Sequence, residues 1–476
     1  MRARFSFCFQ LSQLSQLAAL AAFGLLAGCS TPTPLQPPPA VATPAWHAPL
    51  PHGGQTGQLS AWWSQFDDPL LPALIGEAQA AHPVLSQALA RIQQARASQR
   101  VAASAGWPTV GANVQAQRGS TAATNFTTVS QASAVVDAGW EIDLFGGVRH
   151  GVEAARSRAE QAELGWHEAR VSLAAEVAQT YVALRACEAA AALYTREADS
   201  LGRSSALVQK KADVGFEAPA NARLIQASAA QARDRVTVQQ TECTLTVQAL
   251  VLLTGVDTRA LRTRLAPRTA TLPKPAAFTL STLPAATLTQ RPDLAAAERD
   301  LQASAAEVGV ADAARWPQLT VNGNLGIGLV RTGGSTSDAV TWGFGPNLSL
   351  PIFNRGRLQA QADAARARYD EARAGYALKL RTAVREVEEA LLRLDASQRR
   401  EADARTAAEG LRSFFTSTEE RARLGAASVL ETEDARRQTL SAESALLALR
   451  REQVAAWISL YRAVGGGWTR ENNTPS

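Results

Sequence analysis

The stretch Leu144-Phe145-Gly146-Gly147-Val148-Arg149 is matched 208 residues later by Ile352-Phe353-Asn354-Arg355-Gly356-Arg357. A second landmark recurs at nearly the same distance, because Trp107-Pro108 returns as Trp316-Pro317 after 209 residues. A register kept over so long a span indicates that a module of about two hundred residues is present twice, and a duplicated module predicts pseudo-symmetry.

Alternating patterns follow each Trp-Pro pair. In both copies apolar or small residues alternate with polar ones, and this period of two is typical of strands with one apolar face. Two polar stretches, 119–128 and 331–339, separate the strands and predict one β-hairpin per copy. The strands are expected at about 109–118, 129–143, 318–330 and 340–350.

The sequence beyond Leu26 has no apolar run long enough for a transmembrane helix. If the chain spans a membrane, it must therefore use strands. Four strands are too few to close a barrel, and an open sheet edge cannot face lipid, so closure must come from several chains. A small soluble sandwich with one wet face is the alternative interpretation.

A very long helix is predicted after each hairpin. Residues 150–213 contain no Pro and little Gly, so one helix of about sixty residues, or ~90–95 Å, is expected. The counterpart in the second copy is 358–424. Each ends near a glycine, Gly215 or Gly425, which lie 210 residues apart and can supply the left-handed cap at which a shorter helix turns back.

The N-terminus has the layout of a secretory signal. Arg2 and Arg4 precede an apolar run that is too short to span a bilayer and ends in Leu26-Ala27-Gly28-Cys29. This tetrapeptide resembles a bacterial lipobox, which predicts lipidation of Cys29. An ordinary signal peptide with a chance cysteine is the alternative.

These patterns divide the chain into six parts. The predicted boundaries are a signal peptide 1–28, a lipidated tether 29–57, a first repeat 58–255, a linker or equatorial segment 256–284, a second repeat 285–464 and a C-terminal tail 465–476.

Two cysteines remain once Cys8 leaves with the signal and Cys29 carries lipid. Cys187 and Cys243 each lie 28 residues from Gly215, on opposite sides. An antiparallel hairpin that turns at Gly215 brings them level, so a disulfide is expected in an oxidising periplasm. Two small buried thiols are the alternative.

Motifs for catalysis or energy coupling are missing from the sequence. No lysine follows a glycine, which excludes a P-loop, and the five histidines have no metal-ligand spacing. No G-x-S-x-G elbow occurs. The net charge of +5 comes from arginines interleaved with acidic residues along helices, which favours solvated helix faces over nucleic-acid binding. We therefore expect no enzyme activity, no cofactor, no metal and no nucleic acid.

Together these features resemble the TolC-like outer-membrane efflux factors, and in particular the NodT-type lipoproteins that serve resistance-nodulation-division (RND) pumps. The resemblance covers nearly the whole mature chain. The stretches that carry it are Trp62-Trp63, Asp68-Pro69-Leu70, Ala90-Arg91, Trp107-Pro108, Trp140 to Gly146, Gly425 to Leu430 and Ala435-Arg436.

The resemblance implies an α+β membrane protein in which four strands per chain contribute to a trimeric 12-stranded outer-membrane β-barrel, continued by a long periplasmic α-helical barrel. It implies a passive exit duct for small molecules such as antibiotics. The implied partners are two further copies in a homotrimer, a periplasmic adaptor (membrane fusion) protein, an inner-membrane RND pump and outer-membrane lipid.

In this family the periplasmic tip binds the adaptor and charged side chains near the helical turns hold the tunnel shut. The corresponding adaptor contacts here are Gly215, Gly425 and Ser428. The gate candidates are Arg421, Arg423, Glu431, Glu433 and Asp434. Ordinary helix-end charges in solvent are the alternative for any of them.

Three other functions fit parts of the sequence. A conduit for type I protein secretion and one for metal-ion efflux would have the same architecture. A lipid-anchored structural coiled coil in the periplasm would also need the long helices, but it would not need four alternating strands.

Overall fold

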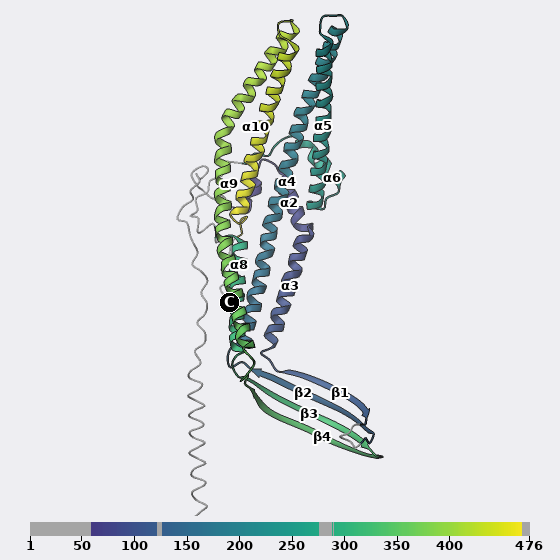
Figure 1. Cartoon of the computed structure of the whole chain (residues 1–476), viewed down its shortest axis with the longest axis vertical. Helices are drawn as coiled ribbons and strands as arrows, with labels where there is room; N and C mark the ends of the chain where they lie inside the picture. Colours follow the sequence, from purple (N-terminus) through teal and green to yellow (C-terminus); the bar gives the residue numbers. More distant parts are fainter. Residues whose placement is uncertain (1–58, 121–125, 276–287, 289, 469–476) are drawn as a thin grey trace, which may run out of the picture. The chain divides into compact units, whose positions relative to one another are not determined.

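The computed structural model describes residues 59–120, 126–275, 288 and 290–468 (Figure 1). The predicted signal peptide, Cys29 and the tether lie outside these residues. The described chain divides into two compact units, each assembled from both sequence copies. The first contains Ser98–Arg156 and Gln302–Glu371, and the second contains Ser157–Leu301, Ala372 onward and the residues before Ser98.

The first unit contains one antiparallel sheet with the strand order β1-β2-β3-β4. The strands are β1 (Thr109–Gly119), β2 (Val129–Ile142), β3 (Gln318–Thr332) and β4 (Ser335–Ser349). The two hairpins are joined directly, because β2 pairs with β3 from Val129↔Thr332 to Ile142↔Leu319. The duplication is therefore built into a single four-stranded sheet, as the labelled arrows of Figure 1 show.

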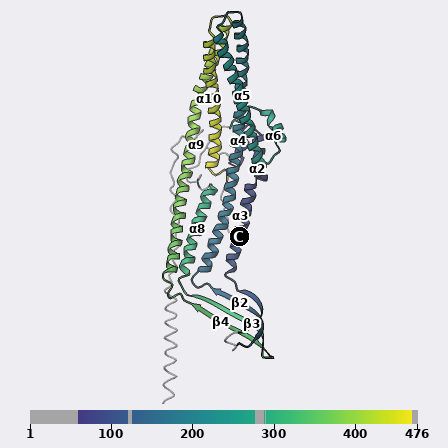
Figure 2. The ribbon, with the colours of Figure 1, turned by 45° about the vertical axis from the view of Figure 1, so that its right-hand side comes forward.

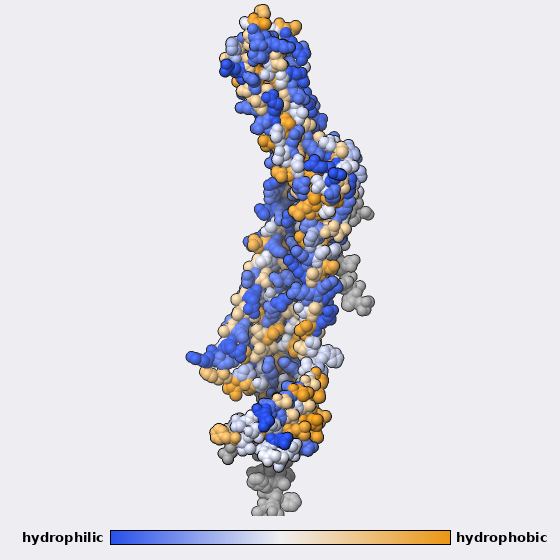
Figure 3. All heavy atoms as spheres, turned by 90° about the vertical axis from the view of Figure 1, so that its right-hand side faces the viewer, coloured by the Kyte–Doolittle hydropathy of each residue, from blue (hydrophilic) through white to orange (hydrophobic). Residues whose placement is uncertain are grey.

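The register separates two faces of this sheet. One face carries polar and glycine residues, for example the row Gly111, Asp137, Asn324 and Gly343, which are partners across all four strands. The other face carries apolar residues, and many of these are exposed, among them Val114 (80%), Val340 (67%), Trp342 (78%) and Phe344 (79%). Figure 3 shows hydrophobic and hydrophilic side chains in adjacent patches over the strands.

The second hairpin is longer than the sequence predicts. Pairing continues to Thr332↔Ser335, so β4 begins five residues before the predicted position 340, and 331–339 is not a loop. Gly333 (φ 57°) and Gly334 (φ 92°) form the whole connection. Two consecutive residues with positive φ are what a tight two-residue hairpin turn requires. The prediction was wrong here because the polar residues from Ser335 to Asp338 hide the strand period.

Two helices of 67 residues each follow the hairpins. They are α4 (Gly147–Asp213) and α9 (Arg357–Arg423). The start of α4 is fixed by Asp143, whose carboxylate accepts hydrogen bonds from the backbone N–H groups of Val148 (3.3 Å) and Arg149 (2.9 Å). A carboxylate at this position satisfies amides that have no partner within the helix.

Shorter helices return beside the long ones. These are α5 (Pro219–Thr254), which follows α4, and α10 (Val429–Ala463), which follows α9. Figures 1 and 2 show each pair running side by side up to its turn. Each copy therefore contributes one helical hairpin to the second unit.

Two α-helices precede β1 in the described part of the chain. They are α2 (Leu70–Ala81) and α3 (Pro83–Ser104), and they separate at His82, whose ψ of 127° is extended. The residue before a proline is disfavoured in the helical region, which explains the break. The helix α8 (Pro292–Ala313) starts at the equivalent proline of the second copy.

The linker between the copies contains further short elements. The helix α6 (Thr258–Leu265) is capped by Asp257, which accepts from the backbone of Arg259 (2.9 Å), and it is followed by the 3-10 turn η4 (Ala266–Arg268). Another 3-10 turn, η2 (Leu59–Gln65), begins the described chain. Residues 276–284 of the predicted linker lie outside the described residues.

An aromatic cluster forms the core of the second unit. Trp62 and Trp63 of η2 pack against Tyr461 of α10, with ring centroids 5.6 and 4.5 Å apart. Trp62 also lies edge-on to Trp457 at 6.1 Å. These contacts fix the first described segment to the last helix of the second copy. None of the described helices has a stretch that is long and apolar enough to cross a bilayer.

Candidate functional site

The two turns at the ends of the helical hairpins have the same backbone geometry. Gly215 (φ 81°) and Gly425 (φ 79°) are both left-handed. The amide of Phe216 donates to the Lys211 carbonyl at 2.8 Å, and the amide of Ala426 donates to the Arg421 carbonyl at the same distance. This is the Schellman arrangement, in which a glycine beyond the helix end lets the last carbonyls find donors.

The helices that leave these turns start differently. In the second hairpin Ser428 caps α10: its hydroxyl accepts from the Glu431 amide (3.1 Å), and the Glu431 carboxylate accepts from the Ser428 amide (2.6 Å). In the first hairpin the residue before α5 is Ala218, which has no capping side chain, and Pro219 starts the helix. A capping box of this kind stabilises a helix start, so the second turn is better fixed.

Large apolar side chains project from both turns. Val214 (67% exposed) and Phe216 (85%) lie at the first, and Leu424 (85%) and Leu430 (64%) lie at the second. Exposed apolar residues gathered at one place often mark a surface that binds another protein. Gly215, Gly425 and Ser428, the predicted adaptor contacts, lie among them.

Three of the predicted gate residues are exposed and pair within their own hairpin. Arg421 donates to the Ala426 carbonyl across the turn (3.0 Å), and Arg423 pairs with Glu420 (2.7 Å). Asp434 accepts from Arg437 (2.9 Å). Within one chain these contacts are ordinary helix-end interactions, each of small energetic value.

The two remaining gate candidates have opposite environments. Glu431 is fully exposed, and the hydrogen bond from the backbone of Ser428 lowers the pKa of its carboxyl. Glu433 is only 9% exposed, and burial raises the pKa of its carboxyl against the opposing charge of Arg436. The structure therefore separates the predicted gate set into a capping residue, a buried acid and three exposed charges.

Glu433 belongs to a buried cluster that connects the two hairpins. Arg436 of α10, 4% exposed, donates to the hydroxyl of Ser204 on α4 at 3.0 Å. Its Nε lies 3.6 Å from the Glu433 carboxylate, and its guanidinium lies 5.2 Å from the centre of the Phe415 ring on α9. Three of the four long helices therefore meet at this arginine.

A second ion pair continues the cluster toward α5. Arg235 pairs with Glu197 of α4 at 3.0 Å. Burial raises the pKa of the Glu197 carboxyl, and the charges of Arg235 and Arg436 oppose that shift. No sequence pattern identifies this cluster, because Arg436 differs from its many exposed arginine neighbours only in the helix face that it occupies.

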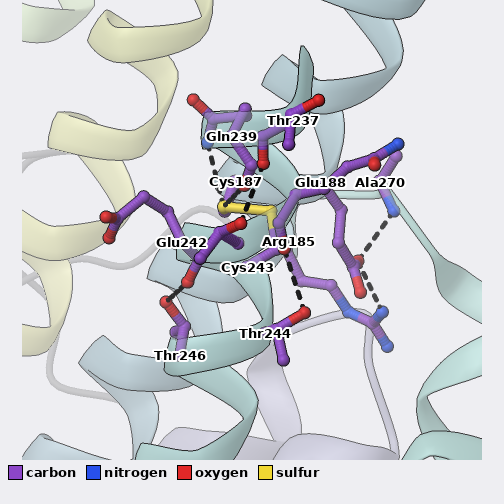
Figure 4. Close-up of a disulfide and its surroundings, with 12 residues drawn as sticks. Arg185, Cys187, Glu188, Thr237, Gln239, Glu242, Cys243, Thr244, Thr246 and Ala270 are labelled. Carbon is purple, nitrogen blue, oxygen red and sulfur yellow. Dashed lines mark hydrogen bonds and ion pairs between the residues drawn. A yellow bond between two sulfur atoms is a disulfide. The ribbon is translucent and has the colours of Figure 1, made fainter. Parts of the chain in front are cut away.

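The first hairpin also contains a covalent link. Cys187 of α4 and Cys243 of α5 form a disulfide with a Cα–Cα distance of 5.5 Å (Figure 4). The side-chain amide of Gln239 lies 2.9 Å from the Cys187 sulfur. In the second hairpin the residue equivalent to Cys187 is Ser397, whose hydroxyl donates to the carbonyl of Leu394.

A buried arginine lies beside this link. Arg185 is fully buried and pairs with Glu188 at 2.9 Å (Figure 4). It donates to the Leu265 carbonyl at 3.0 Å. It also donates to the Tyr181 hydroxyl (3.0 Å), which in turn donates to Asp68 (2.6 Å). Burial and the Asp68 carboxylate raise the pKa of the Tyr181 phenol. The network attaches the equatorial segments to α4.

Among the residues that the structure describes, no group of three or more His, Cys, Asp or Glu side chains could hold a metal ion. The candidate site is the pair of turns together with the cluster around Arg436. Its groups can bind a partner and hold or release helices.

Comparisons with known proteins identify the family of both sequence copies. The family model for outer membrane efflux proteins matches residues 74–256 and 283–466, one match for each copy. The pyoverdine export outer membrane protein OpmQ of Pseudomonas putida is 31% identical, over 94% of this chain and 97% of its own. The toluene efflux pump outer membrane protein TtgI of Pseudomonas putida is 28% identical, over 94% and 97%. Among solved structures, the outer-membrane channel OprN has a TM-score of 0.78 and 29% identity, over 92% of this chain and 98% of its own.

Proposed function

Because this chain belongs to the outer membrane efflux protein family, we propose that it is the passive exit duct of a tripartite pump and conducts small molecules out of the cell. It is an outer-membrane efflux protein whose helices extend into the periplasm. The proposed assembly is a homotrimer that works with a periplasmic adaptor and an inner-membrane pump of the RND class.

The four-stranded sheet is the observation that carries this proposal. Its β1 and β4 are edge strands, and one of its faces is apolar and exposed. In lipid, unpaired backbone groups at a sheet edge each cost several kcal/mol, so the edges need partners. Pairing β4 of one copy with β1 of the next, three times, closes a twelve-stranded sheet with the polar face inside.

The helical turns support the adaptor role. The exposed side chains of Phe216 and Leu424 lie beside left-handed glycines in both copies. In a trimer the six nearly equivalent turns would form one ring, which suits a ring of adaptor subunits. We propose that adaptor contact at Gly215, Gly425 and Ser428 shifts a closed-to-open equilibrium of the hairpins.

The second hairpin is the proposed moving part. The first is held by the Cys187–Cys243 disulfide, whereas the described residues of the second contain only non-covalent links. Arg421, Arg423, Glu431 and Asp434 remain candidates for charges that close the tunnel between chains. Arg436 and Glu433 hold the second hairpin against the first within one chain.

Lipid attachment at Cys29 is part of the same proposal. A lipid anchor and a tether of 29 residues, 29–57, would keep the body at the membrane. Labelling of cells with radioactive palmitate should mark the wild type and leave Cys29→Ala unlabelled.

The cargo class rests on the relatives. One exports pyoverdine and another belongs to a toluene efflux pump, and both are organic small molecules. We propose organic small molecules, including antibiotics, as the cargo, with the pump making the choice among them. Type I protein secretion and metal-ion efflux are the alternatives within transport.

A deletion strain tests the proposal. Loss of the gene should raise the accumulation of a fluorescent pump substrate and lower resistance to organic antibiotics, and the plasmid-borne gene should restore both. Unchanged resistance to every organic compound, with sensitivity to a metal ion instead, would favour the metal-efflux alternative. A monomer whose gel migration does not change on heating would favour the structural coiled coil.

A further inference from the structure

The apolar face of the sheet ends in a row of cationic and hydroxyl side chains. Arg118, Ser130, Arg331 and Thr336 are partners in register across β1, β2, β3 and β4. They are on the apolar face because each lies an even number of residues from its apolar neighbours along the strand. Both arginines are exposed. The row contains only donors and hydroxyls, without a carboxylate.

Both guanidinium groups lack an ion-pair partner in the part of the chain that the structure describes. The adjoining residues 121–125, which are not described, carry no charged side chain in the sequence. The nearest acid on this face is Asp338, one row below, opposite Leu329. Two arginines two strands apart have backbones ~10 Å from each other. Their positive charge is therefore available to an anion from outside the chain.

The position of this row matches a membrane boundary. Below it the face is apolar from Leu329 down to Leu319, ten residues along β3, except for Asp338 on the edge strand. Ten residues span ~33 Å, and a strand tilted by ~40° covers ~25 Å of membrane thickness, which is the height of an outer-membrane apolar band. The arginine row is two residues further and falls at the headgroup level.

A hollow of about 430 Å³ lies at this boundary. Its lining includes both arginines, Ser130 and Thr336, together with the apolar row that contains Ala116 and Leu329 and with Gln117 and Gln131, whose side chains alternate to the polar face. One part of the hollow therefore offers N–H and O–H donors, and the other offers aliphatic carbon. Arginine holds phosphate through two parallel hydrogen bonds, which a single point charge does not provide.

We propose that this row, the Arg118–Arg331 row, binds the phosphate groups of a lipid headgroup while the acyl chains lie on the apolar face below. The inference rests on the proposed placement of the sheet across the outer membrane. The strands' other ends lead directly into α4 and α9, which are periplasmic, so the row lies at the outward end. The ligand is a phosphorylated lipid of the outer leaflet.

The test uses the purified full-length trimer, delipidated in detergent, with bound lipid counted by native mass spectrometry. The probes are diphosphoryl lipid A, phosphatidylethanolamine and inorganic phosphate. The wild type should bind added lipid A in preference to phosphatidylethanolamine, and inorganic phosphate should not displace the bound lipid A. Arg118→Gln with Arg331→Gln should weaken lipid A binding by ~30-fold, since each cation near an anionic surface contributes about fivefold.

Two further variants distinguish a specific loss of lipid A binding from a folding defect. Asp338→Asn removes the repelling acid and should strengthen lipid A binding several-fold. Arg259→Gln removes an exposed charge from α6 and should change nothing. Equal lipid A binding by the wild type and the double variant, or no gain with Asp338→Asn, overturns the proposal. Displacement by inorganic phosphate overturns it too, since the ligand would then be free phosphate.

This readout is separate from the duct function. Efflux can fail in a variant that still binds lipid A, and lipid A binding can fail in a variant that still complements a deletion strain. Each result therefore bears on only one of the two proposals.

Discussion

Replacing Arg436 with methionine should loosen the second helical hairpin. The side chain lies between α4, α9 and α10, where it donates to Ser204 and faces the buried carboxylate of Glu433. Methionine keeps much of the aliphatic volume but removes the charge. Glu433 is then left buried, with no cation at ion-pair distance among the described residues.

The size of the effect follows from burial. The side chains of Arg436 and Glu433 are only 5% and 11% exposed, so solvent screens their interaction little. Removal of one partner of a buried ion pair typically costs about 3–5 kcal/mol. The Nε and Nη1 atoms of Arg436 have no hydrogen-bond partner among the described residues, so the wild-type ion pair is already weaker than an ideal one. We therefore expect a cost at the lower end of this range. A loss of about 3 kcal/mol corresponds to a roughly 150-fold higher opening equilibrium.

The pH dependence has a defined sign. The folded-state pKa of Glu433 is already raised above its unfolded value by burial, so this carboxyl favours the folded hairpin at low pH and that contribution is lost as pH rises through the folded pKa. Without Arg436, which opposes the shift, the pKa rises further. The defect of Arg436→Met should therefore be largest at high pH and shrink as Glu433 becomes protonated.

Hydrogen exchange measured by mass spectrometry on the folded trimer is the assay. Peptides from α10 near residue 436 should exchange roughly 150-fold faster in Arg436→Met at pH 8, after correction for the intrinsic rate. Arg437→Met is the matched control, because Arg437 is 72% exposed and pairs only at the surface, so its effect should stay near ~0.5 kcal/mol or less. Adding Glu433→Gln to Arg436→Met should restore much of the protection. Equal exchange in the two methionine variants would refute the reasoning.

Three further predictions concern the disulfide, the turn and the sheet. Cys187→Ser with Cys243→Ser opens a loop of 56 residues, for which chain entropy gives about 4 kcal/mol, and limited proteolysis should cleave the first hairpin faster than in the wild type. Gly425→Ala places a Cβ on a residue with φ 79°, which costs ~1–2 kcal/mol and should speed hydrogen exchange at the second turn. Gly410→Ala is the control: it adds a Cβ in open space within α9 and should slow hydrogen exchange slightly. Asp137 has the one charged side chain in its row on the polar face, so Asp137→Asn should lower the preference for cations over anions in reversal-potential measurements.

Much of the fold follows from periodicity and from the repeat. The glycine pair Gly215 and Gly425, the long helices and three of the four strands lie within a few residues of their predicted positions. These features depend on local rules, such as alternation along a strand and left-handed caps. They can therefore be predicted from a single sequence.

The differences arise where local rules compete or where contacts are distant in sequence. The early start of β4 was hidden by polar residues that pair across a Gly333-Gly334 turn, and the break at His82 depends on the proline that follows it. The buried role of Arg436 depends on Ser204, 232 residues away. No pattern in a single sequence distinguishes such an arginine from a solvated one.

Single-channel recording in planar bilayers would decide whether the assembled trimer is a gated channel. The purified wild-type trimer should insert and conduct poorly, and a variant combining Arg436→Met with Glu431→Gln and Asp434→Asn should give discrete, long-lived current steps several-fold larger. Insertion of both proteins as heat-modifiable trimers, with no current steps from either, would contradict a channel function.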